Sequence, residues 1–142
     1  MSETNDNKKP VLLKVISVVI IIAGISGIIS NYMLQSGYQA VNVRFQSYLD
    51  SWTLIDKIVP YVLNPLLILS AICMSKYKLI SLKLYLAYLI LVLLSTIIHF
   101  LSTSWYEYYG LKGIAATTVS MSISLGVYFY LLKLEKSGKL TE

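Results

Sequence analysis

The sequence predicts an all-α integral membrane protein, a four-transmembrane-helix bundle that forms one domain over residues 1–142. Only 13% of the residues are charged and 56% are hydrophobic, whereas a soluble domain carries about 25% charged residues. So little polar surface does not cover a globule in water. The chain also contains four apolar runs, each long enough to cross the hydrocarbon core of a bilayer. Lysines gather in the short segments that separate alternate runs, as expected for a multi-pass protein.

The predicted spans cover about residues 11–34, 58–75, 84–101 and 113–132. The first of them follows Lys8 and Lys9, and basic residues before an apolar run also describe a secretory signal peptide. However, the run is longer than the roughly 7–15 apolar residues of a signal core, and no clear A-x-A-like cleavage site follows it. We therefore expect this run to be retained as the first span.

The orientation of the spans follows from the basic connector 75–83, because short loops that carry lysine stay on the cytoplasmic side. With this connector inside, the nine inner basic residues are Lys8, Lys9, Lys14, Lys76, Lys78, Lys83, Lys133, Lys136 and Lys139. The three outer ones are Arg44, Lys57 and Lys112. The sequence thus predicts cytoplasmic N and C termini. The Lys, Ile, Tyr and Asn bias is typical of an AT-rich bacterial genome, so we expect a multi-pass protein of the bacterial cytoplasmic (inner) membrane.

Aromatic residues mark both predicted outer loops. In the first loop, Val41, Phe45, Tyr48, Trp52 and Ile55 recur at steps of four, three, four and three, which predicts a short amphipathic interfacial helix over about 41–55. Tyrosine and tryptophan favour the membrane interface. The predicted outer aromatic surface consists of Trp52, Trp105, Tyr106, Tyr108 and Tyr109. We expect the two aromatic segments to pack together, either as an anchor or as a surface that binds a ligand such as a cation.

Small residues at helical spacing predict where helices approach closely, since helix association in lipid depends on packing. The predicted helix-packing residues are Ala23, Ser26, Gly27 and Ser30 in the first span, and Ala116, Ser120, Ser124 and Gly126 in the fourth. Their partner is either another helix of the same chain, a second copy in a homo-oligomer, or another membrane protein. Because the fourth span is dense in small and hydroxyl residues, we expect it to lie centrally in the bundle.

Three residues form possible polar or substrate-binding points within the spans. Asn64 precedes Pro65, which removes a helical hydrogen bond. A transporter uses such an interrupted, polar point to hold a substrate near the midplane, but we expect a local kink whose polar groups are satisfied by neighbouring groups. His99, the only histidine, lies near the outer end of the third span. It is either a proton sensor or, as we expect, a hydrogen-bonded interface histidine.

Several functional classes lack support in the sequence. We find no nucleophile elbow, phosphate-binding loop, zinc helix motif or Gly-rich dinucleotide turn. Cys73 is the only cysteine, so it forms neither an intramolecular disulfide nor a Cys-based metal site. The lysines flank the spans instead of forming one wet basic face, which argues against nucleic acid as a partner. We expect no catalysis, no cofactor and no metal.

These observations favour a small non-enzymatic membrane protein that acts by lateral helix–helix association within the lipid bilayer. In bacteria this class includes accessory or regulatory subunits of membrane complexes and immunity proteins that neutralise membrane-active toxins. The alternative is an oligomeric transporter or channel for a small or lipid-like solute, using Asn64 and the hydroxyl-bearing fourth span. Nothing in the sequence identifies the partner.

Overall fold

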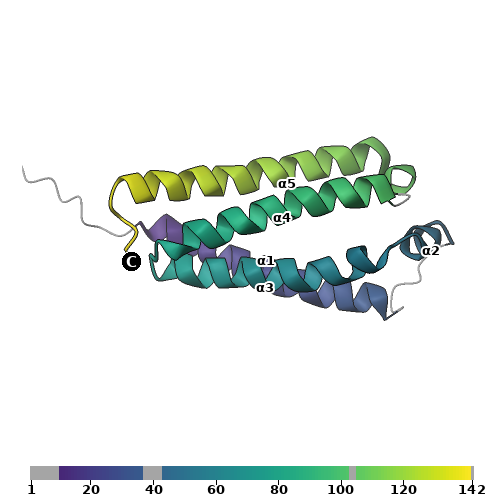
Figure 1. Cartoon of the computed structure of the whole chain (residues 1–142), viewed down its shortest axis with the longest axis horizontal. Coiled ribbons are helices and arrows are strands. Elements are labelled where there is room, and N and C mark those ends of the chain that lie inside the picture. The colour runs from purple at the N-terminus through teal and green to yellow at the C-terminus, as the bar shows by residue number, and fades with distance from the viewer. Residues whose placement is uncertain (1–9, 37–42, 103–104, 142) are drawn as a thin grey trace, which may run out of the picture.

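The computed structural model describes residues 10–36, 43–102 and 105–141, and the elements formed there are helices. They are α1 (Val11–Gln35), α2 (Val43–Asp50), α3 (Leu54–Ser75), α4 (Ile80–Ser102) and α5 (Trp105–Lys136). All except α2 are long and apolar enough to cross a membrane. The prediction of an all-helical chain with four helices able to cross a membrane is therefore confirmed for the described residues (Figure 1).

The helices pack in a simple order, with α1 against α3, α3 against α4, and α4 against α5 (Figure 1). Helix α5 lies at the edge of this bundle, where it contacts α4 and, near one end, α2. The expectation of a central fourth span is therefore wrong. The hydroxyl groups of Thr118 and Ser122 explain why, because they donate to the carbonyls of Ile114 and Thr118 in their own helix, both at 2.9 Å. These groups need no neighbouring helix to satisfy them.

Some helix boundaries differ from the prediction because of local caps and breaks. Helix α3 begins at Leu54 instead of residue 58, since Thr53 and Asp56 form a reciprocal capping box. This cap also separates α3 from α2, which ends at Asp50, so the predicted helix over 41–55 is split. In α5, Gly110 has φ 56° and ψ −148°, a backbone conformation that glycine tolerates. Gly110 therefore makes a kink between the helical aromatic segment 105–109 and the main part of α5.

The contact between α1 and α3 is built around glycines. A Cβ atom placed on Gly24 would lie 2.6 Å from Cγ1 of Ile68, and one placed on Gly27 would lie 2.7 Å from Oδ1 of Asn64. At Gly24 the backbone of α3 is also near, since the Asn64 carbonyl oxygen would lie 3.4 Å from the added Cβ atom, whereas Gly27 makes room for the Asn64 side chain. Helix α3 continues through Pro65, and the adjacent Asn64 side chain packs against α1.

One end of the bundle, here called the basic end, contains the start of α1, the connector 75–83 and the C-terminal tail 137–141. Leu13, Met74 and Leu131 are fully buried there. The tail pairs with the connector, since Thr141 N–H donates to the Tyr77 carbonyl at 2.7 Å and Leu79 N–H donates to the Thr141 carbonyl at 2.6 Å. This end therefore combines a close-packed apolar core with backbone hydrogen bonds between distant segments.

Candidate functional site

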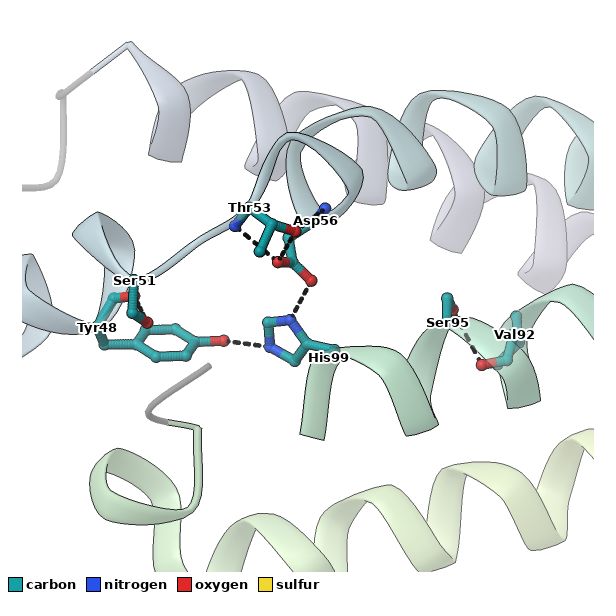
Figure 2. A network of polar contacts seen from close by, with 7 residues as sticks. All are labelled: Tyr48, Ser51, Thr53, Asp56, Val92, Ser95 and His99. Atoms are coloured by element: carbon teal, nitrogen blue, oxygen red, sulfur yellow. Dashed lines mark hydrogen bonds and ion pairs between the residues drawn. The ribbon is translucent and has the colours of Figure 1, made fainter. Parts of the chain in front are cut away.

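The opposite end of the bundle, here called the aromatic end, contains α2, the start of α3, the end of α4 and the start of α5 (Figure 1). Three of these helices meet at His99 (Figure 2). Its Nδ1 lies 2.6 Å from Oδ1 of Asp56 in α3, and its Nε2 lies 2.8 Å from the hydroxyl of Tyr48 in α2. With Asp56 ionised and the imidazole carrying its proton on Nδ1, Nδ1–H donates to the carboxylate and Nε2 accepts from the Tyr48 hydroxyl.

Asp56 is held from two directions. Its side chain is only 4% exposed, and its Oδ2 accepts from Thr53 N–H at 2.8 Å and from the Thr53 hydroxyl at 2.5 Å. A buried carboxylate is costly unless hydrogen bonds of this kind satisfy it. The capping box of α3 and the bond to His99 thus form one continuous network, here called the Tyr48–His99–Asp56 network (Figure 2).

The Tyr48 side chain attaches α2 to the rest of the aromatic end. Its ring stacks on Tyr108 with centroids 5.2 Å apart and planes 10° apart, and it meets Trp52 and Tyr109 edge-on. Burial raises the pKa of Tyr48 to about 12, so its hydroxyl stays protonated and continues to donate near neutral pH. The expected packing between the two aromatic segments is present in the described residues.

A groove of about 920 Å³ opens beside His99, between α3, α4 and α5. Its walls are mainly apolar, with Leu63, Leu93 and Met121 among the lining residues. The lining hydroxyls of Thr118, Ser122 and Ser95 donate to carbonyls of their own helices. The groove therefore presents largely hydrocarbon along its length, and its ionisable residues Asp56 and His99 lie at one end.

The groove occupies only the half of the bundle next to the aromatic end. Along the main part of α5 it extends from Ile114 to Leu125, about 17 Å at the helical rise of 1.5 Å per residue. Towards the basic end, the buried side chains of Tyr85, Leu89 and Leu131 belong to the apolar core. The groove thus has the depth of one leaflet, since the whole hydrocarbon core is about 30 Å thick.

The structure brings together some of the residues singled out in the sequence and separates others. Trp52, Trp105 and His99 line the groove, whereas Tyr106 is exposed. Asn64, Pro65 and Gly27 lie away from it; of these, Asn64 and Gly27 meet at the α1–α3 contact. Exposed positions on the spans include Ala23, Ser26, Ser30, Ala116, Ser120 and Gly126, while Ser124 is half-buried.

Sequence reasoning missed Asp56 and Tyr48 as the partners of His99. One signal for Asp56 was present, because Thr53 and Asp56 have the three-residue spacing of a capping box. That spacing places Asp56 in the first turn of α3, but it gives no indication that a histidine 43 residues away meets it. The expectation of a hydrogen-bonded histidine agrees with the observed geometry.

The polar groups of this site bond mainly to one another. Both ring nitrogens of His99 are engaged, and Tyr48 is 5% exposed, so neither presents a reactive atom at a free surface. Within 10–36, 43–102 and 105–141, no three His, Cys, Asp or Glu residues lie close enough to hold a metal ion. The network therefore acts mainly to join α2, α3 and α4 at one end of the groove.

A scan against protein-family models, a search of curated proteins and a search of solved structures each found no match to this chain. The fold and the site define its class on their own. The described residues form a small helical bundle with four helices long and apolar enough to cross a membrane and a lateral groove at one end, as in a multi-pass membrane protein.

Proposed function

We propose that this protein is a non-enzymatic binding protein of the bacterial cytoplasmic membrane, which receives a membrane-embedded guest in the groove between α3, α4 and α5. The observation that carries the proposal is the groove itself. Its volume of about 920 Å³ falls within the range of roughly 300–1,000 Å³ typical of small-molecule sites. An apolar groove at this depth in a bilayer is open to lipid-soluble molecules, so its guest arrives from within the membrane.

The charge distribution supports an orientation with the basic end in the cytoplasm. The described lysines of that end are Lys14, Lys76, Lys78, Lys83, Lys133, Lys136 and Lys139, against Lys57 and Lys112 near the aromatic end. Positive residues favour the cytoplasmic side, and tryptophan and tyrosine favour an interface. In this orientation the groove faces the outer leaflet. A reporter fused after Lys139 should therefore be active only in the cytoplasm.

A photocrosslinking pair tests whether the groove holds a particular guest. A benzophenone amino acid is placed either at Met121, which lines the groove, or at Val119, which is 59% exposed on α5 and does not line it. In native membranes we expect Met121 to give one dominant adduct. Position 119 should give a mixture that follows the bulk lipid composition. Identical adduct patterns at the two positions would contradict the proposal.

A second candidate function, lateral helix–helix association, is supported by the small residues on the outside of the bundle. Ala23 of α1 and Ser120 of α5 are exposed, and nothing lies within 4 Å of a Cβ atom placed on Gly126. Such faces suit a partner helix, as an accessory subunit, an immunity protein or a homo-oligomer requires. The clean test is Ser120→Leu, which should abolish partner co-purification without unfolding the chain. Gly27→Leu is unsuitable because Gly27 packs inside the bundle.

A further inference from the structure

We propose that the guest of the groove is a phospholipid of the outer leaflet, held by its acyl chains along the groove and by a zwitterionic, amine-bearing headgroup at Asp56 and Trp52. This inference rests on the proposed function, because it names the class of molecule that the groove takes. Three features of the described residues support it: the size of the groove, its closed inner end and the charge at its mouth.

The size of the groove favours a lipid over a transmembrane helix. A helix about 10 Å wide and 30 Å long occupies more than about 2,000 Å³, at least twice the groove volume of about 920 Å³. A helix crossing the whole bilayer would also need a continuous surface along the bundle. An acyl chain is narrower, flexible and confined to one leaflet, so it matches the volume and the length together.

The inner end of the groove limits how far a guest extends. The buried residues Leu82, Tyr85 and Leu89 of α4 join Leu131 of α5 in the core that begins where the groove stops. A guest therefore inserts from the aromatic end and ends near the midplane. This is the geometry of a lipid in one leaflet, with its chains towards the midplane and its headgroup at the interface.

The mouth of the groove offers one acceptor and one donor to a headgroup. A carboxylate has about four lone-pair sites, and three bonds to Asp56 are already present, one from His99 and two from Thr53. One acceptor site on Asp56 therefore remains. The indole N–H of Trp52, which also lines the groove, is buried. It lies near the Tyr48 hydroxyl and interacts with it, but it makes no hydrogen bond of standard geometry among the described residues, so a phosphate oxygen would have to compete with Tyr48 for it.

The charge at the mouth selects among lipid headgroups. The residues that line the groove include one carboxylate, Asp56, and no lysine or arginine. The nearby Lys57 lines a separate pocket of about 150 Å³ with Gln35, Gln46 and Asp50. A negative site favours an ammonium donor, and the Trp52 N–H complements a phosphate oxygen. Phosphatidylethanolamine carries both groups, whereas phosphatidylglycerol carries a net negative charge that the site repels.

The test uses the full chain in vesicles of equimolar phosphatidylethanolamine and phosphatidylglycerol with identical acyl chains. After gentle detergent extraction, native mass spectrometry counts the lipids that stay bound. We expect phosphatidylethanolamine to be enriched about tenfold over phosphatidylglycerol, the factor that one charge-assisted hydrogen bond supplies. Asp56→Asn should bring this ratio close to one. Trp52→Phe, which removes only the indole N–H at that position, should lower the retention of both lipids about threefold and leave the ratio unchanged, because both lipids carry a phosphate.

Two further variants separate failure of this inference from failure of the groove function. Thr117→Trp fills the groove and should abolish lipid retention, while Val119→Trp, on an exposed face of α5, should not. Equal retention of both lipids, unchanged in Asp56→Asn and Trp52→Phe, would overturn the headgroup assignment. If the benzophenone at position 121 crosslinks to a protein and no lipid is retained, the lipid assignment is overturned. The proposal that the groove binds a membrane-embedded molecule then still holds. Wild-type lipid retention in Thr117→Trp would remove the groove as the site.

Discussion

The two ends of the bundle are stabilised by different means. At the basic end, apolar side chains such as Leu13, Met74 and Leu131 are fully buried, and the tail 137–141 is hydrogen-bonded to the connector through Tyr77. At the aromatic end, the helices leave a groove between them, and a small polar network and a cluster of aromatic rings join them.

This difference separates stability from binding. A close-packed end fixes the positions of the helices, because removal of any atom there leaves a cavity. An end joined by a few hydrogen bonds and ring contacts leaves space for a bound molecule. These contacts still fix the relative positions of the helices that line the groove. Functional sites are commonly found in the less densely packed part of a fold, and the groove lies there.

Two methionines give the most direct comparison of the ends. Met74→Ala at the basic end should lower the free energy of unfolding by about 2–5 kcal/mol, because it leaves a cavity in a fully buried position. Met121→Ala, on the wall of the groove, should cost less than about 1 kcal/mol. Unfolding of both variants by sodium dodecyl sulfate in detergent micelles, followed by circular dichroism, measures this. Equal losses would show that the ends are packed alike.

Two glycines compare the inside of the bundle with its outside. Gly27→Leu should destabilise the protein by about 3 kcal/mol, because even its Cβ atom would meet Asn64 at 2.7 Å. Gly126→Leu, with open space around it, should change stability by less than about 0.5 kcal/mol. The same unfolding assay applies. A neutral Gly27→Leu would mean that α1 and α3 separate freely.

At the aromatic end, His99→Phe keeps a ring but removes both hydrogen bonds of the imidazole. Asp56 then lies buried with one oxygen unpaired, so we expect a loss of about 2 kcal/mol. A double-mutant cycle with Asp56→Asn isolates the interaction, since two contacting residues should show a coupling of at least about 0.5 kcal/mol. Additive losses would show that Asp56 and His99 do not act as a pair.

The architecture was predictable because the signals that define spans are local. Run length and lysine position depend on neighbouring residues alone, and they located all four long helices, with every boundary except the start of α5 within about four residues. The start of α5 at Trp105 was missed because only Gly110 interrupts its helix, and a single glycine does not show whether the preceding segment is helical.

The site was less predictable because it is formed by contacts distant in the sequence. Asp56 and His99 are 43 residues apart, and Tyr48 and His99 are 51 apart. No periodicity links them. The edge position of α5 was not predicted for a related reason. The sequence does not show whether the hydroxyl groups of Thr118 and Ser122 donate to carbonyls of their own helix, as observed, or to a neighbouring helix.

The smallest effect concerns the Tyr48 hydroxyl. Near pH 8, Tyr48→Phe should cost about 1 kcal/mol through the lost hydrogen bond to His99. Burial raises the folded-state pKa of Tyr48 to about 12, above the unfolded value near 10. The stabilising contribution of the neutral hydroxyl is therefore fully present below pH 10 and is lost as the pH rises towards 12. Unfolding free energies of both proteins at pH 8 and pH 11 measure this, and other titrating groups cancel in the difference. The advantage of the wild type should shrink at pH 11, and a constant difference would show that the hydroxyl ionises alike in both states.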